Sequence, residues 1–405
     1  MREAALLISC DVLPDQCVQL KDLSNHEWRS LLRWLDYSGL ALYFLDRIVE
    51  LGLADWLPAP VLARLHQSQT DNTERTHGML AESVAIQKMF QTACLSYAVL
   101  KGVSLCPMSV PRPDLRSQFD LDFLVAESDA REATQVLVSR GYRLYATSCK
   151  SLEFKFNEKP GVTLNELYKD LSSFAVELHL ESYPSEHRSL LQHAEKRDIC
   201  GISMPVLSPI DLFLGQAQHA FKHVCGEFTR AAHLLEFRRH VLARYSDDVF
   251  WTDLKAVADQ TPGASTALGA VTLLIASAMG EFAPESLIGW TVRQLPGSVQ
   301  LWVNMYGRRA ILGSIPGSKL YLLLRRQVET TERLTKASVR RRLVPLHLPH
   351  PVIRPFPNET IAFQINRYRM QVWHFLSRLR FHFVEGLRYA WHSYCWRQHL
   401  HRLSI

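Results

Sequence analysis

The pattern of hydrophobic and polar positions changes twice along this chain of 405 residues. Residues 1–95 carry apolar side chains at intervals of three and four, which is the spacing of one face of an α-helix. Residues 96–182 instead contain short apolar runs of the length and composition of strands. Residues 183–290 return to the helical spacing. We therefore expect an α+β protein in which a small mixed sheet lies between N-terminal and C-terminal helical regions.

Five short runs in the middle region are predicted to be strands. They are residues 97–100, 118–125, 142–147, 152–156 and 174–180. One helix is expected between the second and third runs, where SDAREATQVLVSRGY offers Ser128 as an N-cap and Gly141 as a C-terminal stop. The predicted order is therefore strand, loop, strand, helix and three further strands.

The last part of the chain is basic and differs from the rest in composition. Residues 291–405 hold 19 Lys and Arg against 4 Asp and Glu, whereas residues 1–290 hold 27 against 36. We expect a basic helical segment over residues 291–344, a proline-rich linker over residues 345–358 and a basic, aromatic helix over residues 359–405. This polarity indicates a tail that contacts an anionic partner or the acidic body of the protein itself.

The composition of the expected C-terminal helix leaves three roles open. Arginines interleaved with aromatic side chains are typical of surfaces that bind nucleic acid. The same composition is typical of helices that lie in a membrane interface. The third role is structural, with the aromatic side chains packed on the body and the arginines facing water. The sequence does not choose among them.

We expect a cytoplasmic protein, with peripheral attachment to a membrane through the tail as the alternative. The first residues, MREAALLISCDV, have only a short apolar stretch, so no secretory signal is expected. Residues 264–280 carry no charge, but they are short for a bilayer span and favour a buried core helix. The eight cysteines form no C-x-x-C pair, which argues against both a zinc site and a disulfide framework.

Two aspartates lie inside an apolar strand, in the run FDLDFLV. Because side chains alternate along a strand, Asp120 and Asp122 share one face while the flanking apolar residues share the other. Two like charges on one face repel, and removing them from water is costly unless a positive charge lies between them. Most D-x-D pairs lie on solvated loops, but alternation with large apolar residues indicates a strand that holds a cation.

A third carboxylate belongs to the last predicted strand. In FAVELHL, Glu177 shares a face with His179. A D-x-D pair and one acid on a neighbouring strand supply the oxygen ligands that two Mg²⁺ ions need, with Mn²⁺ as an alternative. Two such ions support in-line displacement at a phosphorus atom. Two alternatives to a role in the site stay open. Glu177 can be a charge at the edge of a strand, and His179 can pack beside the end of the strand.

Positively charged residues precede the aspartates along the chain. Lys101 and Gly102 follow the first strand, where a lysine and a closely approaching backbone can meet phosphates. Arg116, just before the second strand, can add a further positive contact. Each of these is a weak signal alone, and the prediction depends on their order and spacing relative to the three acids.

The order of these motifs resembles the nucleotidyltransferase superfamily, and in particular a bacterial family described as uncharacterised nucleotidyltransferase. The resemblance is carried by LKGVSL, RSQFDLDFLV, a helix that ends in GY, and VELHL, and it extends over about residues 25–290. It implies a nucleotidyltransferase-like core and an NTP substrate. It also implies that Asp120 and Asp122 bind the metal ions, and that Glu177 is the third ligand or the base that activates the acceptor.

The resemblance implies further that Lys101, Gly102 and Ser104 contact the nucleotide phosphates. Many members of the superfamily have glycine and serine directly after the first strand, whereas this chain has Lys-Gly-Val-Ser at residues 101–104. Ser104 is therefore a candidate for the phosphate-binding hydroxyl. The acceptor is expected against the helices that follow the sheet.

The leading hypothesis is an Mg²⁺-dependent transferase that moves a nucleoside monophosphate from an NTP to an acceptor hydroxyl and releases pyrophosphate. A glycosyltransferase that holds a nucleotide sugar through D-x-D would need an α/β half of about a hundred residues before the motif, where this chain is predicted to be helical. A non-catalytic protein of the same fold that binds a nucleotide or a partner is the other alternative. RNA, a protein or peptide, a small molecule and a saccharide are all compatible acceptors.

Two histidines further along the chain have the spacing of metal ligands. His219 and His223 are four residues apart on a predicted helix, so their side chains share one face. The sequence shows no third ligand beside them. A structural role is therefore favoured over a metal site.

Overall fold

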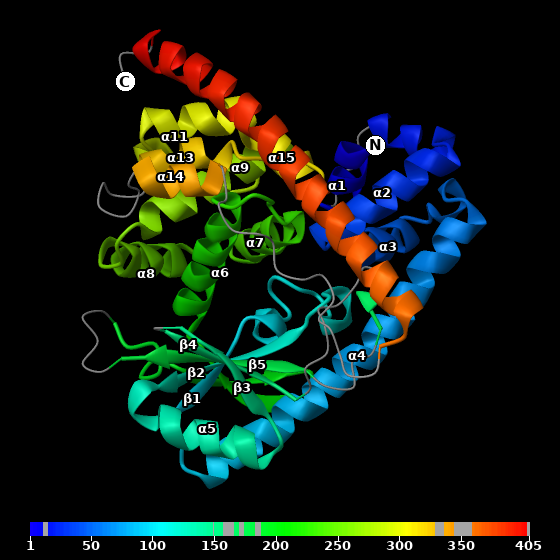
Figure 1. The fold of residues 1–405 in the computed structure, drawn as a ribbon. Coiled ribbons are helices and arrows are strands. Elements are labelled where there is room, and N and C mark those ends of the chain that lie inside the picture. Colours follow the sequence, from blue (N-terminus) through cyan, green and yellow to red (C-terminus); the bar gives the residue numbers. More distant parts are fainter. Residues whose placement is uncertain are drawn as a thin grey trace.

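The computed structural model of the chain describes residues 1–10, 15–148, 150–156, 166–169, 174–182, 188–328, 336–343 and 359–402. A mixed sheet of seven strands lies at one end of the molecule, and helices make up the other end (Figure 1). In space the strands follow the order β3-β4-β5-β2-β1-β7-β6. Their bounds are β1 (Tyr97–Leu100), β2 (Asp120–Ala126), β3 (Arg143–Thr147), β4 (Ser151–Lys155), β5 (Ala175–Glu181), β6 (Glu195–Ile199) and β7 (Ile202–Val206).

All five predicted strands are present, and the central strand is the one with the two aspartates. β2 pairs antiparallel with β1 on one side and parallel with β5 on the other. Helices α4 (Ala59–Thr92) and α5 (Ala130–Ser139) cover one face of the sheet (Figure 1). Phe123 of β2 is fully buried on that face, where its ring lies 5.5 Å from the ring of Phe90 on α4. The apolar half of the β2 pattern therefore anchors the strand in the core.

The sheet extends beyond residue 182, where the sequence pattern ended it. β6 and β7 form an antiparallel hairpin, and β7 joins the sheet beside β1. The turn between them contains Cys200 and Gly201, both with positive φ. β6 is one of two edge strands, with β3 at the opposite edge, and it reads EKRDI, so it lacks an apolar alternation that would mark it as a strand.

The predicted helix after β2 is present, but its N-cap was wrong. A short 3₁₀ turn over Glu127–Asp129 comes first, the N-cap is Asp129, and the hydroxyl of Ser128 donates to Asp129 instead of accepting from a backbone N–H of the helix. Gly141 has φ +99° just after the helix, as predicted for a C-terminal stop.

The helices before and after the sheet form a second core together. The N-terminal helices are α1 (Arg2–Ser9), α2 (Asn25–Ser38) and α3 (Ala41–Glu50). After the sheet come α6 (Pro209–Val224), α7 (Ala231–Ala243), α8 (Asp248–Asp259) and α9 (Ala264–Met279). α9 is buried in this core, as predicted for the charge-free segment. Within the described part of the chain, no helix has the length and hydrophobicity needed to span a bilayer.

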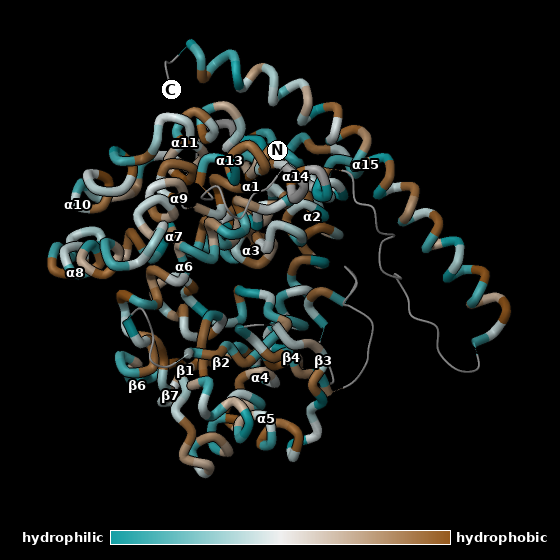
Figure 2. The backbone as a smooth tube through the Cα atoms, turned by 60° about the vertical axis from the view of Figure 1, so that its left-hand side comes forward, coloured by the Kyte–Doolittle hydropathy of each residue, from teal (hydrophilic) through white to brown (hydrophobic). Residues whose placement is uncertain are grey.

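The C-terminal region is helical, as predicted, and ends in one long helix. Its elements are α10 (Glu285–Ile288), α11 (Gly297–Trp302), α12 (Arg308–Leu312), α13 (Tyr321–Val328), α14 (Lys336–Leu343) and α15 (Ile361–Arg402). The predicted linker over residues 345–358 lies outside the described residues. The end of α15 nearer the C-terminus lies on the helical body, while its first half extends away from it (Figure 2).

Candidate active site

The register of the sheet brings two of the three predicted acids side by side. Asp122 on β2 is the direct partner of Glu177 on β5, and on its other side of Leu100 at the end of β1. One carboxylate oxygen of Asp122, one of Glu177 and one ring nitrogen of His179 lie within 4.8 Å of one another. The alternating pattern of β2 and β5 thus places these side chains on one face of the sheet.

Asp120 lies two residues before Asp122 on the same face of β2, and its direct partner is Ala175. Its side chain reaches solvent, whereas Asp122 is buried. Protein atoms still surround Asp120 closely enough for desolvation to raise its pKa, and the negative charge of Asp122 raises that pKa further. The two aspartates are therefore near one another, with Asp120 at the outer edge of the site.

Two neighbours of Asp122 keep its carboxylate ionised. Lys101 Nζ donates to Asp122 Oδ1 over 2.8 Å, and His179 Nε2 lies 2.9 Å from the same oxygen. Burial alone would raise the pKa of Asp122, but the contacts with His179 and Lys101 outweigh it and lower the pKa below its ordinary value. The sequence left His179 undecided between the site and the core, and the structure places it in the site.

Lys101 reaches Asp122 because the backbone after β1 turns sharply. Lys101 and Gly102 both have positive φ, at 50° and 46°. The left-handed φ of Gly102 favours glycine, and a Cβ at this position would also lie 2.4 Å from Oε1 of Gln118, so the end of that side chain would have to move. Ser104 is fully buried, and its hydroxyl donates to the Lys101 carbonyl over 2.7 Å. Its hydroxyl thus stabilises the turn, and its contact with phosphate stays a prediction.

Arg116 connects the site to the helical region. Its Nε donates to Glu236 on α7 over 3.1 Å, and Tyr43 on α3 donates to the same carboxylate oxygen. Arg116 and Asp120 interact electrostatically, so the guanidinium lies near the outer edge of the site. Close by, Arg230 donates to the hydroxyl of Ser117 over 3.1 Å. A positively charged wall therefore flanks the carboxylates on the side of α3 and α7.

A fourth acid beside the site was not recognised from the sequence. Glu153 on β4 is the direct partner of Glu177 on β5, and its carboxylate binds Lys155 over 2.8 Å. The run LEFKF alternates as FDLDFLV does, so the signal was present in the sequence. Register was the missing information, because alternation places Glu153 on a face but does not say which residue lies opposite.

The comparison with protein families agrees with this geometry. Residues 24–280 match a family described as uncharacterised nucleotidyltransferase, which is more than half of the chain. The chain belongs to this family. The range shared with the uncharacterised nucleotidyltransferase family contains the whole sheet, the three predicted acids and the helices α6 to α9. No curated protein matches the chain.

Solved structures that resemble the chain share little sequence with it. An antigenic nucleotidyltransferase-like protein from Paracoccidioides brasiliensis is 16% identical and covers 54% of this chain and 98% of its own, with a TM-score of 0.31. The crystal structure of ANT(2″)-Ia in complex with adenylyl-2″-tobramycin is 10% identical and covers 45% and 98%, with a TM-score of 0.33. A solution structure of the antibiotic-resistance factor ANT(2″)-Ia is also 10% identical, covers 46% and 97%, and has a TM-score of 0.30. At these scores the resemblance carries no argument about substrates.

Proposed function

We propose that this protein transfers a nucleoside monophosphate from an NTP to an acceptor hydroxyl and releases pyrophosphate. The observation that carries the proposal is the direct pairing of Asp122 with Glu177, in a chain whose family is described as nucleotidyltransferase. In this reaction the acceptor oxygen forms a bond to the α-phosphorus. The bond between that phosphorus and the pyrophosphate oxygen breaks, and the acceptor proton passes to a base.

We propose Asp120, Asp122 and Glu177 as the ligands of Mg²⁺, with Mn²⁺ as an alternative. The donor set fits these ions because all three ligands are carboxylates, and hard cations prefer oxygen. When bound, the ions would neutralise charge on the triphosphate and on the leaving pyrophosphate. His179 would hold the Asp122 carboxylate in position, and Glu177, which is only partly buried, would complete the ligand set or take the acceptor proton.

The positive groups beside the carboxylates are proposed to bind the triphosphate. Lys101 and the backbone at Gly102 lie at the turn after β1, next to Asp122. Arg116 is anchored by Glu236 and faces Asp120 at the outer edge, so it is already oriented when a phosphate arrives. Ser104 would act mainly through the turn that it stabilises. The acceptor would lie against α6 and α7, and its class is not specified by these residues.

Thermal unfolding with a panel of Mg²⁺·NTPs and nucleotide sugars tests the binding step without an acceptor. A ligand at about 100 times its Kd stabilises the native state by about 2.7 kcal/mol, which raises the midpoint. We expect one Mg²⁺·NTP to raise it in the wild type, and Asp122→Asn or removal of the metal to abolish the shift. Glu132→Gln, an exposed acid on α5, is the matched control and should keep the shift.

Pyrophosphate release with candidate acceptors then separates the remaining hypotheses. Release that requires metal and Asp122 supports the transferase. A nucleotide-dependent shift without release under any acceptor supports the non-catalytic alternative. Stabilisation by nucleotide sugars and not by NTPs would support a glycosyltransferase and contradict the proposal.

We further propose that α15 attaches the protein to an anionic membrane surface. Large apolar side chains recur along its exposed side at intervals of three and four, and all of the following are exposed: Ile361, Ile365, Tyr368, Val372, Phe375, Leu379, Phe383, Leu387, Trp391 and Tyr394. The helix also carries seven arginines against a single acid, Glu385, which is buried. An exposed apolar stripe beside arginines fits an interfacial helix, because acyl chains take the apolar side chains and lipid phosphates take the arginines.

A further inference from the structure

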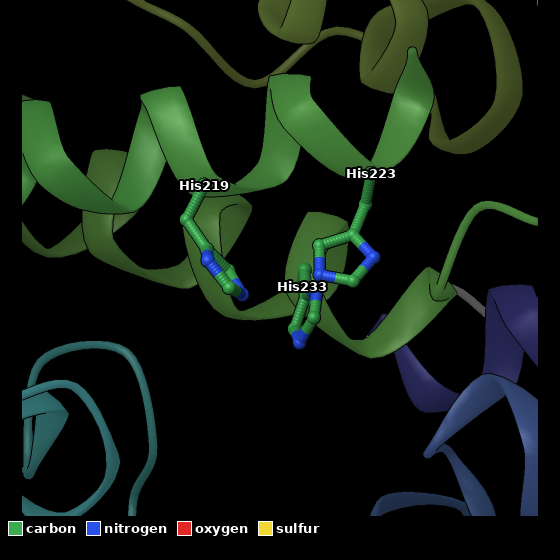
Figure 3. A group of neighbouring side chains, drawn as sticks. All are labelled: His219, His223 and His233. Carbon is green, nitrogen blue, oxygen red and sulfur yellow. The ribbon is translucent and has the colours of Figure 1, made fainter. Parts of the chain in front are cut away.

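Three histidines converge where α6 meets α7, outside the group of acids. His219 and His223 project from α6, and His233 projects from α7 toward them (Figure 3). The ring centroids lie 4.8 Å apart for His219 and His223, 4.7 Å for His219 and His233, and 4.5 Å for His223 and His233. One nitrogen from each ring lies within 4.8 Å of the other two. The cluster shares no residue with the group of Asp122, Glu177 and His179.

The local fold explains why these rings meet. Residues four apart on a helix lie one above the other, so His219 and His223 face the same side of α6. α6 ends at Val224, and the short connection to α7 returns His233, the third residue of α7, to that side. The sequence offered the first two ligands and no third, because ten residues and a change of helix separate His233 from His223.

His233 is buried without a hydrogen bond that would explain its position. Its side chain is 5% exposed, and its Nδ1 has no hydrogen-bond partner among the described residues. A buried polar atom without a partner costs free energy of folding. A phenylalanine or leucine in place of His233 would fill the same space without that cost. A packing role alone therefore does not account for a third imidazole at this place.

The three rings are also held in the form that can bind a metal. Burial lowers the pKa of His219 to about 3 and that of His223 to about 4, and it also lowers the pKa of His233 well below its ordinary value. Nearby positive charges add to this effect, from Lys101 at His219 and from Arg230 at the other two rings. At neutral pH all three imidazoles are uncharged, and a neutral imidazole has the lone pair that a metal ion requires.

We propose that His219, His223 and His233 form a binding site for one Zn²⁺ ion. Zinc takes imidazole nitrogens at about 2.0–2.1 Å in a tetrahedral arrangement, which separates ligand nitrogens by about 3.3 Å. The ligand nitrogens now lie within 4.8 Å of one another, so they approach by at most about 1.5 Å to reach this separation. Imidazole nitrogens favour Zn²⁺ over Mg²⁺, which prefers oxygen ligands, and the positive charges of Lys101 and Arg230 oppose both cations equally without changing that preference.

The site differs in kind from a structural zinc site. Within the described residues the cluster offers three ligands, and three protein ligands leave one tetrahedral position for water or for an oxygen of a substrate. The absence of C-x-x-C pairs, which argued against zinc in the sequence, bears on cysteine sites and not on this one. The chain would then hold two metal sites of opposite preference, with carboxylates for Mg²⁺ and imidazoles for Zn²⁺.

Metal content and affinity test the proposal on the full chain. The protein is stripped with a chelator, equilibrated with ZnCl₂ and measured for retained zinc, and Co²⁺ is added separately as a spectroscopic probe. We expect one zinc per chain and the visible absorption bands of tetrahedral Co²⁺. His223→Gln and His219→Gln should each weaken zinc binding by about 100-fold or more, since loss of a ligand exceeds the 10–100-fold loss typical of its supporting residues.

Two control variants locate the ion. Asp122→Asn, in the carboxylate group, and His240→Gln, a buried histidine of α7 outside the cluster, should both retain one zinc per chain. If zinc uptake is lost in Asp122→Asn and kept in His223→Gln, the ion belongs to the carboxylate group and the proposal is wrong. The proposal is equally wrong if the wild type, after stripping and equilibration with ZnCl₂, retains no zinc. His219 and His223 are only partly buried, so their variants keep the test valid even if His233→Gln fails to fold.

Discussion

At the scale of single residues, Gly102 decides how Lys101 meets Asp122. Gly102→Ala would meet two obstacles, a left-handed backbone at φ +46° and the side chain of Gln118. Gly52→Ala is the matched control, because its φ of +66° is similar and a Cβ added there would have no atom within 4 Å. Backbone strain alone costs about 1–2 kcal/mol, so Gly102→Ala should cost more than Gly52→Ala in the free energy of unfolding measured with urea.

A second variant separates strain from contact at this turn. Gln118→Ala removes the atom nearest to the new methyl group, so the double variant should recover the excess loss of Gly102→Ala over Gly52→Ala. Equal losses in the two single variants would show that Gln118 moves aside without cost.

Buried His240 makes the free energy of unfolding depend on pH, because its imidazole takes up a proton more readily in the unfolded chain. It is buried on α7, its Nδ1 donates to Gln216, and burial lowers its pKa to about 3. In the unfolded chain the pKa is about 6.5, so below that pH the unfolded state binds one more proton than the folded state. The stabilisation is complete above about pH 6.5 and is lost as the pH falls toward 3.

The slope of unfolding free energy against pH measures this contribution. In His240→Asn the slope between pH 6 and pH 4 should be smaller than in the wild type by up to about 1.4 kcal/mol per pH unit. The slope is informative even though the variant loses packing, because a cavity shifts the whole curve without changing its slope. An unchanged slope would mean that His240 already takes up its proton in the folded state.

At the scale of elements, the sequence predicted β2 and β5 from an alternation that includes a buried face. The acids that interrupt this pattern predicted that Glu177 lies on a strand beside that of Asp122, and the structure shows the two strands paired. β6 was missed because its run EKRDI shows no apolar alternation, whereas β3, the exposed strand at the opposite edge, reads RLYAT and was predicted. The pairing of Glu177 with Glu153 was missed for a different reason, since partners across strands follow from register, which no single run encodes.

Helices show the same division between local and non-local information. The spacing of His219 and His223 placed both on one face of α6, as the structure shows (Figure 3). His233 could not be assigned to them, because its approach depends on how α7 packs against α6. For the same reason, composition predicted α15 as a basic, aromatic helix but could not say which of its aromatic side chains are buried.

At the scale of the whole molecule, only part of α15 packs on the body of the protein, which was one of the three roles that the sequence left open for this helix. From Phe381 onward the helix packs on the body through Phe381, Tyr389 and Trp396, and buried Glu385 accepts from the backbone of Lys319. Among the described residues of the helix, none before Phe381 is buried, and this first part of the helix extends away from the body (Figure 2). Packing on the body therefore explains part of the helix and leaves its exposed apolar stripe to another surface.

Cosedimentation with lipid vesicles tests whether that surface is a membrane. The full chain should bind vesicles of phosphatidylcholine with phosphatidylserine more tightly than vesicles of phosphatidylcholine alone, and salt should weaken the difference. Trp373→Ser and Trp391→Ser, at side chains 74% and 65% exposed, should each reduce binding by roughly 10-fold, because burying such a side chain is worth about 1.5–3 kcal/mol. Val249→Ser, 73% exposed on α8, should leave binding unchanged. Binding of single-stranded RNA in place of either vesicle, with a steep loss in salt, would assign the arginines to nucleic acid and overturn the membrane proposal.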